Sequence, residues 1–361
     1  MKTSKYFRSI PKFGGFLKNQ VGRREPTVAY VGGWLGKLNL GDELLFTAYQ
    51  RLFPRLTFWH YDGGRVADQL YGWSPRRLGG FLGGGTLIGQ HKMWQVFTQQ
   101  FQRHGDPFLV FGSGVANPEL WPDGAPLKDW KPLLDSARFV GVRGPVSARF
   151  LSDAGIAEPE VVGDPAIVFA RGSVDSSFRP ESLVLNIGVA DGRLWGSEEK
   201  VKTEMSGLAR VARKAGWQVS WLVVWPKDLA ITREAAEDSG TLGGVKEIYT
   251  DHEKFIDIVG SASVMVGMKL HATILGTCAG TPSIMLEYRS KCRDYMESID
   301  HGEYVVRTDE VLAGELWERV QEMNRHRRRL ADCLMTSVQI LQAKQLKAAR
   351  RLEADLFGQT D

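Results

Sequence analysis

The sequence predicts an α/β protein of two Rossmann-like domains that face each other across a cleft, followed by a long C-terminal helical tail. Three observations predict this fold class. Short apolar segments alternate with helical patterns along most of the chain, which is typical of parallel β/α/β winding. The 361 residues exceed one typical hydrophobic core and suit two domains of about 150 residues each. A polar, helix-breaking stretch near the middle of the chain separates two series of segments.

Apolar segments in the first half of the chain each lead into a glycine-rich turn. Residues 27–31 precede GGWLGKLNLGD and then a helical pattern over residues 43–53, and Gly83, Gly84 and Gly85 follow the next apolar segment. The same pattern recurs after residues 108–111, 139–142 and 161–162. Because ligands of α/β sheets bind outside the carboxyl ends of the strands, we expect these turns to cluster at the binding edge. The three glycines would there permit close backbone approach to a ligand, or serve only a tight exit from the strand.

Residues 171–180, with the sequence RGSVDSSFRP, are the best candidate for an interdomain linker. Beyond them the alternation restarts, with strands expected at residues 183–189, 219–225, 247–249, 264–266 and 283–286. We therefore expect an N-terminal Rossmann-like domain over residues 25–172 and a C-terminal one over residues 180–307. Two such domains across a cleft form a GT-B-like architecture, the one that GT-B glycosyltransferases adopt.

The two ends of the chain differ from the domains. Residues 1–24 form a basic tail with seven basic and no acidic residues, and residues 308–361 read as a charged helical tail that packs back on the N-terminal domain. Basic ends could attach the protein to an anionic membrane surface, because each Lys or Arg there contributes about 1 kcal/mol. A solubilising tail explains them equally well. Nucleic acid is not an expected partner, because the body between the ends is net acidic and would repel phosphate.

Bulk composition is that of an ordinary soluble globular protein, with 43% hydrophobic and 24% charged residues. No apolar stretch approaches the roughly 20 residues that span a bilayer, and the N-terminus lacks a secretory signal. Three cysteines without CxxC spacing predict neither a disulfide framework nor a zinc site. We expect a cytoplasmic protein, with peripheral attachment to the inner face of the plasma membrane as an option. No metal is expected, because no DxD pair or cluster of His and carboxylates appears.

The segment MKLHATILGTCAGTPSIMLEYRSK, residues 268–291, carries the strongest functional signal. It follows an expected strand, so Lys269, Leu270 and His271 should lie where a strand ends and a helix begins. The free N–H groups and the dipole of a helix N-terminus favour anions, and the two basic side chains add donors. An anionic ligand is therefore the first hypothesis. The alternative is that His271 caps or packs against the helix and Lys269 is solvated.

Four segments together resemble the polysaccharide pyruvyl transferase family. They are NLGDELL (39–45), FLGGGTLIG (81–89), VGVRGPVSARFLSDAGI with VVGDPAIVF (140–169), and the segment at 268–291. No single motif is diagnostic, but their order and spacing are specific. The resemblance implies a GT-B-like fold and a transfer of the pyruvyl unit of phosphoenolpyruvate onto a sugar, with a ketal as product. The donor is then phosphoenolpyruvate, the acceptor is a glycan or a lipid-linked sugar, and no cofactor is needed.

The resemblance also assigns residues to the donor. Arg143 would bind the phosphate or the carboxylate, since a planar guanidinium can hold either bidentately. Lys269 and Leu270 would contact the donor beside it. Many relatives have arginine where this chain has Lys269, so the fork geometry is lost there. His271 matches the family histidine that is proposed as acid and base, a role that suits an imidazole with a pKa near neutrality.

Further residues of the same motifs are candidates. Asp42 matches the aspartate of the family's N-x-G-D motif and would act as base or bind the acceptor hydroxyl, although it could equally cap a helix. Asn39 of that motif is a second candidate. Tyr288 and Lys291 are further candidates if they reach the cleft, with exposed surface as their default position.

Two other classes of function stay open. One is a GT-B-type glycosyltransferase with a nucleotide-sugar donor, and the other is a non-catalytic assembly partner that kept the fold. The chain has no G-x-x-x-x-G-K-[ST] loop and no G-x-S-x-G elbow, which argues against the common ATPase and serine hydrolase sites.

Overall fold

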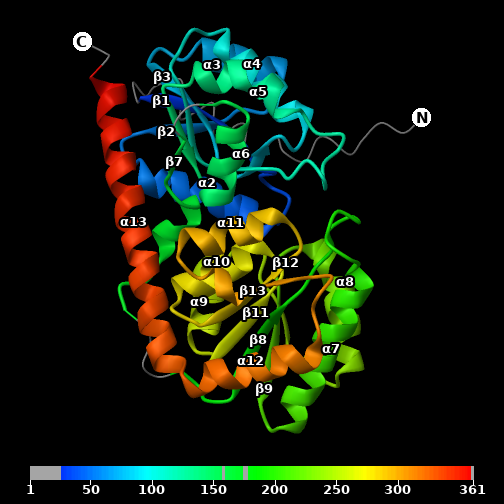
Figure 1. The fold of residues 1–361 in the computed structure, drawn as a ribbon. Helices are drawn as coiled ribbons and strands as arrows, with labels where there is room; N and C mark the ends of the chain where they lie inside the picture. Colours follow the sequence, from blue (N-terminus) through cyan, green and yellow to red (C-terminus); the bar gives the residue numbers. More distant parts are fainter. Residues whose placement is uncertain (1–25, 157–158, 174–177, 359–361) are drawn as a thin grey trace.

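A computed structural model gives the fold of residues 26–156, 159–173 and 178–358. The basic segment 1–24 and residues 174–177 of the expected linker lie outside the described residues. Figure 1 shows two α/β domains stacked end to end, with the C-terminal helix α13 running along both. Each domain is built on its own parallel sheet. The expected α/β, two-domain fold class is therefore confirmed.

The sheet of the N-terminal domain has the strand order β2-β1-β3-β5-β6-β7, with β4 paired to β5. Its strands are β1 (Thr27–Val31), β2 (Thr57–His60), β3 (Arg77–Leu82), β4 (Gly85–Ile88), β5 (Phe108–Val115), β6 (Phe139–Val142) and β7 (Glu160–Val161). The helical segments between and after them are α2 (Leu40–Leu52), α3 (Arg65–Gly72), α4 (Lys92–Gln102), α5 (Leu127–Asp135), α6 (Pro145–Asp153) and the short 3₁₀ helix η1 (Pro165–Phe169). Strands β1 and β5 are buried along their whole length, as expected for a parallel sheet covered on both faces.

The sheet of the C-terminal domain has the order β10-β9-β8-β11-β12-β13. Its strands are β8 (Ser182–Asn186), β9 (Gln218–Val223), β10 (Val245–Glu247), β11 (Val264–Gly267), β12 (Ser283–Glu287) and β13 (Val305–Arg307). The helices are α7 (Glu198–Lys214), α8 (Leu229–Asp238), α9 (His252–Gly260), α10 (Leu270–Cys278) and α11 (Ser290–Ser298), with short 3₁₀ turns η2 (Pro226–Asp228), η3 (Leu242–Gly244) and η4 (Gly302–Tyr304). Reversal of strand order beside β8 and β11 creates the crevice where such sheets bind ligands.

Sequence patterns missed three strands and misplaced the ends of three others: the strand expected at residues 219–225 ends at Val223, the one expected at 247–249 lies at Val245–Glu247, and β8 ends early. Strands β2 and β13 are short edge strands, and β4 begins at a glycine, so none of them shows a long apolar run. The strand expected at residues 183–189 ends at Asn186. Its side chain donates to the Leu222 carbonyl at 2.8 Å and accepts from the Lys269 N–H at 2.9 Å, and both bonds hold the chain where it leaves the sheet.

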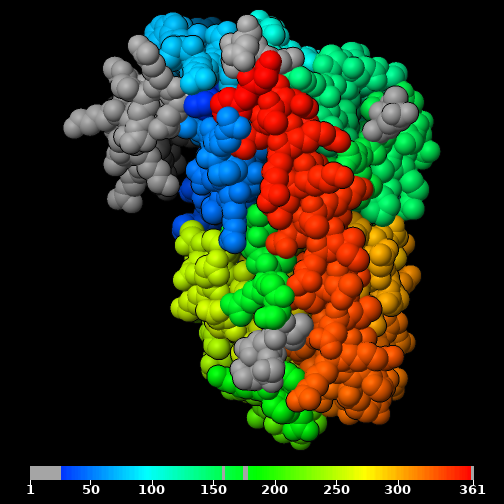
Figure 2. Space-filling model, turned by 90° about the vertical axis from the view of Figure 1, so that its left-hand side faces the viewer, coloured from blue at the N-terminus to red at the C-terminus, as the bar shows by residue number. Residues whose placement is uncertain are grey.

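Two helices make up the segment expected to be a helical tail. Helix α12 (Ala313–Arg325) packs on α7 of the C-terminal domain, and α13 (Arg327–Phe357) then contacts α10, η1, α2 and β3. Figure 2 shows the two helices, orange and red, passing along one side of the molecule over both domains. On the N-terminal domain, Gln345 donates to the Asp164 carbonyl at 2.9 Å, and Glu353 accepts from the Arg55 N–H at 2.9 Å. Within the described ranges, no helix has both the length and the apolarity to cross a membrane.

The two domains are packed directly against each other. One cluster of buried apolar residues extends from the N-terminal sheet into the C-terminal sheet. The Leu40 N–H at the start of α2 donates to the Val224 carbonyl of the other domain at 3.0 Å. Asp294 of α11 accepts from the N–H of Ser147 at 2.9 Å and from its hydroxyl at 2.7 Å, and so caps α6 from across the interface. These bonds fix the walls of the space between the domains.

Candidate active site

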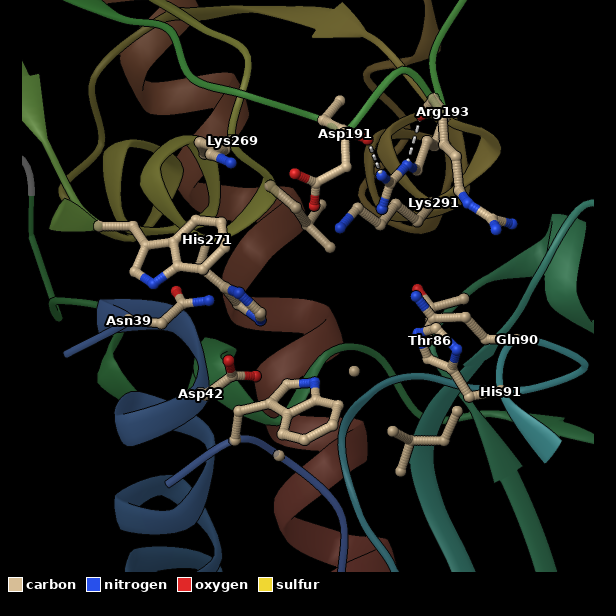
Figure 3. Close-up of a pocket in the computed structure, with 18 of the residues that line it drawn as sticks. Asn39, Asp42, Thr86, Gln90, His91, Asp191, Arg193, Lys269, His271 and Lys291 are labelled. Carbon is tan, nitrogen blue, oxygen red and sulfur yellow. Dashed lines mark hydrogen bonds between the residues drawn. The ribbon is translucent and has the colours of Figure 1, made fainter. Parts of the chain in front are cut away.

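A cleft of about 630 Å³ opens between the two domains, and its walls come from the loops that follow the strands of both sheets. Figure 3 shows Asn39, Asp42 and His271 on one side of this cavity and Thr86, Gln90 and His91 on the other. Its lining Lys and Arg residues are Lys37, Arg143, Arg193, Lys227, Lys269, Arg289 and Lys291, and its lining carboxylates are Asp42 and Asp191. Because cations outnumber carboxylates, the cleft attracts negative charge.

The start of α2 meets the start of α10 at the base of the cleft. Asn39 caps α2, since its side-chain oxygen accepts from the Gly41 N–H at 3.2 Å. A Cβ atom on Gly41 would lie 2.1 Å from Nδ1 of His271, far inside any normal contact. The glycine of the NLGD motif is therefore required so that the His271 ring can pack on the α2 backbone.

His271 stands in the first turn of α10, and its side chain is 17% exposed toward the cleft. Its Nε2 atom lies 3.8 Å from Oδ2 of Asp164 and makes no hydrogen bond among the described residues. Burial lowers the pKa of His271 to about 4, with the charges of Lys291 and Arg143 acting in the same direction and Asp164 opposing them. The imidazole is thus neutral at pH 7 and has a free nitrogen.

Asp42 lies in the first turn of α2, beside the same space. Burial raises its pKa to about 6, although the charge of Lys291 and a hydrogen bond from the Trp34 N–H favour the carboxylate. Asn39, and not Asp42, is the residue that caps the helix. The sequence-based alternative that assigned the cap to Asp42 is therefore wrong, and its carboxylate is free to face the cleft.

Arg143 lies at the end of β6 and is completely buried, yet it lines the cleft floor. Its Nε donates to Oδ2 of Asp164 at 3.0 Å, and its Nη1 lies 3.4 Å from the Thr86 hydroxyl and 3.9 Å from Asp294. Only Nη2 has no partner among the described residues. An anionic ligand could therefore bind Nε together with an Nη atom only if Asp164 moved away. Without such a movement, Nη2 is the N–H group of Arg143 that remains for a ligand.

Lys269 and Lys291 differ in their freedom to bind an anion. The Lys269 ammonium lies 3.0 Å from Oδ1 of buried Asp228 and donates to the Val189 carbonyl at 2.7 Å, so its charge is already compensated. Lys291 lines the cleft and has no ion pair or side-chain hydrogen bond within the part of the chain that the structure describes. Burial lowers the pKa of Lys291 to about 7, and the nearby Arg289 contributes to this shift. Lys291 is thus the less compensated of the two cations.

The remaining predicted residues divide between the cleft and the core. Leu270, Tyr288, Gly84 and Gly85 line the cleft, so the default position of Tyr288 and Lys291 on exposed surface is wrong. Gly83 does not line it. A Cβ atom on Gly83 would lie 2.4 Å from the buried Tyr30 ring, so this glycine serves packing.

Sequence reasoning missed most of the aromatic residues that line the cleft. It also missed Asp164 and Asp228, the carboxylates that pair with Arg143 and Lys269. The unpredicted lining residues include Trp34, Trp94, Trp121, Trp225, Arg193, Lys227 and Arg289. They come from segments far apart in the chain, so no local pattern joins them. Asp164 was available as a signal, because it belongs to the VVGDP motif. No group of three or more His, Cys, Asp or Glu residues that could hold a metal ion occurs among the described residues.

The two facing domains and the cleft at their strand ends define a GT-B-type protein. Similar solved structures include a UDP-glucosyltransferase from Polygonum tinctorium (TM-score 0.55, 12% identity, covering 92% of this chain and 98% of that chain) and UDP-bound MnaA from S. aureus (0.58, 10%, 86% and 90%). A glycosyltransferase from Rickettsia africae ESF-5 is similar too (0.56, 10%, 93% and 99%). At these identities the likeness shows the fold alone.

The family itself follows from the sequence motifs around this cleft. The model of the polysaccharide pyruvyl transferase family matches residues 39–290, which include α2, Arg143, α10 and most of the lining described above. The chain belongs to this family, as the resemblance of its motifs predicted. No curated protein gives a significant sequence match.

The contact between Gly41 and His271 predicts the effect of a single methyl group. In Gly41→Ala the added Cβ must displace the imidazole or separate α2 from α10, and we expect transfer activity to fall about 100-fold, as for a catalytic group moved by about 1 Å. Gly314→Ala is the matched control, because that helical glycine has no neighbouring atom within 4 Å. Steady-state kinetics of both variants test this expectation. Full activity of Gly41→Ala would show that the position of the His271 ring does not matter.

Proposed function

We propose that the protein transfers the pyruvyl group of phosphoenolpyruvate onto two hydroxyls of a sugar, with a cyclic ketal and phosphate as products, in polysaccharide or glycolipid biosynthesis. Membership in the polysaccharide pyruvyl transferase family supports the reaction class. The observation that carries the proposal is the packing of His271 against the first turn of α2, which gathers an imidazole, the Asp42 carboxylate and the uncompensated Lys291 at one cleft.

Donor binding would use the cationic side of the cleft. Lys291, Arg143 Nη2 and the free N–H groups in the first turn of α10 are available for the phosphate and carboxylate. Lys269 keeps Asp228 and Val189 as partners, so it would position the loop beside the donor and supply little net charge. Leu270, Gly84 and Gly85 would complete the walls around the donor.

Proton transfer to the donor would depend on His271. Its pKa near 4 leaves the imidazole neutral at pH 7. The phosphate and carboxylate of a bound donor add negative charge beside the ring and raise the pKa of His271. Donor binding would therefore cause His271 to take up the proton that it then transfers to the donor. Protonation of the methylene carbon leaves a positive charge on the neighbouring carbon, where an acceptor hydroxyl can attack.

Asp42 would take the proton of the attacking hydroxyl. Its raised pKa of about 6 makes it a stronger base than an ordinary carboxylate while leaving it ionised at pH 7. Attack forms the first carbon–oxygen bond, and phosphate then departs with the electrons of the bond that held it. A second hydroxyl then attacks the same carbon, closes the ring and loses its proton. Overall, one phosphoenolpyruvate and one diol give one ketal and one phosphate.

His271→Ala tests the chemistry separately from binding. We expect phosphate release from phosphoenolpyruvate in the presence of a hexopyranose acceptor to fall at least 100-fold, because a general acid contributes roughly 10²–10⁴-fold. Phosphoenolpyruvate should still raise the melting temperature of the variant, since Lys291 and Arg143 remain. Retained turnover would contradict the role of His271. Stabilisation of the wild type by UDP and not by phosphoenolpyruvate would favour a nucleotide-sugar glycosyltransferase, and stabilisation by neither would favour a non-catalytic partner.

We expect kcat/KM to be high only over a narrow range of pH. Below about pH 6 Asp42 gains a proton and no longer acts as a base, and above about pH 7 Lys291 loses the charge that binds the donor, so kcat/KM should peak between these values. The phosphate of the donor also titrates near pH 6, so the fall of kcat/KM at low pH has two possible causes. The fall at high pH, the alkaline limb of the profile, is therefore the part that tests the role of Lys291. In Lys291→Arg the alkaline limb should move beyond pH 9, because arginine stays charged. An unchanged alkaline limb in that variant would remove Lys291 from the donor site.

We also propose peripheral attachment at the cytoplasmic face of the plasma membrane, where a lipid-linked acceptor would be available. Exposed cations on α13, including Arg328, Arg329, Lys344 and Lys347, add to the basic segment 1–24. Co-sedimentation with vesicles that contain 30% phosphatidylserine, but not with phosphatidylcholine vesicles, is the expected result at about 0.1 M salt. Equal recovery with both vesicle types would contradict it.

A further inference from the structure

The two walls of the cleft differ in chemistry. On the C-terminal domain the wall carries five cations, Arg193, Lys227, Lys269, Arg289 and Lys291. On the N-terminal domain it carries three tryptophans, Trp34, Trp94 and Trp121, neutral polar side chains such as Asn39 and Gln90, and only two cations, Lys37 and Arg143. A donor with three carbons and a phosphate fills only part of about 630 Å³. The aromatic wall therefore has room for a second, mostly uncharged ligand.

Trp34 is the aromatic residue of this wall that is open to a ligand. It lies in the loop between β1 and α2, and it is 46% exposed although it lines the cleft. The loop is held on the first turn of α2, since the Trp34 N–H donates to the Asp42 carboxylate and the Gly36 N–H donates to Glu43 at 2.5 Å. The Trp34 backbone, from which the indole extends, thus has a fixed position relative to the proposed base.

Two other tryptophans that line the cleft, Trp121 and Trp225, are already covered by cations. Arg193 lies 4.2 Å and Arg289 5.3 Å from the centre of the Trp121 ring. The ammonium groups of Lys227 and Lys269 lie 4.6 Å and 5.1 Å from the Trp225 ring. Trp34 has no such cation within the described residues. Its ring packs edge-on against Trp94, with centroids 5.6 Å apart, which leaves aromatic surface for a ligand.

Trp94 supplies a second, independent sign of a ligand. Trp94 lines the cleft and is only 3% exposed. Its Nε1–H has no hydrogen-bond partner within the described ranges. Buried indole N–H groups normally find an acceptor, because an unpaired one loses its hydrogen bond to water. An oxygen atom of a ligand seated on Trp34 would satisfy it.

We propose that Trp34 and Trp94 form the acceptor subsite, where a hexopyranose packs its apolar C–H face on the Trp34 ring. The sugar ring has an apolar face and a hydroxyl rim, which matches an exposed indole beside a buried N–H donor. Its hydroxyls then accept from Trp94 Nε1 and reach the Asp42 carboxylate, which the Trp34 backbone holds in place. The identity of the sugar as a pyruvyl acceptor rests on the proposed function, but the binding itself does not need the donor.

Saturation-transfer difference NMR with the full chain tests this subsite. The probes are the methyl pyranosides of glucose, galactose, mannose and N-acetylglucosamine. We expect at least one of them to receive saturation from the wild type, strongest at its ring C–H protons. Trp34→Ala should lose this signal or weaken the affinity at least tenfold, and Trp34→Phe should retain most of it. Trp73→Ala is the matched control, because Trp73 is 75% exposed and lies outside the cleft.

A parallel thermal-shift titration with phosphoenolpyruvate separates the two proposals. Donor stabilisation should be the same in the wild type and in Trp34→Ala, because Lys291, Arg143 and the first turn of α10, which are proposed to bind the donor, are unchanged in that variant. Absence of saturation transfer from the wild type to every probe, or an equal signal from Trp34→Ala, would overturn the acceptor subsite. Sugar binding that depends on Trp34, without any stabilisation by phosphoenolpyruvate, would support the subsite and contradict the proposed donor instead.

Discussion

The site depends on one contact between the two domains, in which the His271 ring packs on the backbone of α2 at Gly41. This contact brings the first turn of α10 against the first turn of α2, and with it the imidazole to the same cleft as Asp42. The hydrogen bond from Leu40 to Val224, the cap that Asp294 provides for α6 and the passage of α13 over both domains hold the arrangement. A side chain larger than hydrogen at Gly41 is incompatible with it.

Charge in the site is partly compensated and partly left free. Arg143 is paired with Asp164, and Lys269 is paired with Asp228, so two of the cations that line the cleft are already neutralised inside the protein. Lys291, His271 and Asp42 lack such partners, and burial shifts the pKa of each toward its neutral form. Groups of this kind cost folding free energy, and their clustering in a cleft is typical of functional sites.

The same scaffold carries unlike chemistries, so the fold does not choose among them. Similar solved structures include a UDP-glucosyltransferase, a UDP-bound protein and a glycosyltransferase, and the likeness of each to this chain shows the fold alone. Family membership and the side chains at the cleft are what support the proposed pyruvyl transfer. The unequal walls add a physical distinction, because most of the lining cations come from the C-terminal domain and three of the four lining tryptophans from the N-terminal domain.

The sequence by itself determined the fold class and the family, and it singled out several residues that line the cleft, among them Asp42, His271 and Lys291. Those features are local: alternation of apolar segments has a fixed period, and the NLGD and MKLH motifs each occupy a few consecutive positions. Short edge strands such as β2 and β13 escaped prediction because too few residues carry their pattern.

Only the tertiary structure decided which charges are free and which glycine approaches which side chain. The pairing of Lys269 with Asp228, the packing role of Gly83 and the exposure of Trp34 beside Trp94 each depend on segments that are distant in the chain. Compensation of a charge and access to a ligand are properties of the distance between side chains, and no local sequence pattern contains that distance.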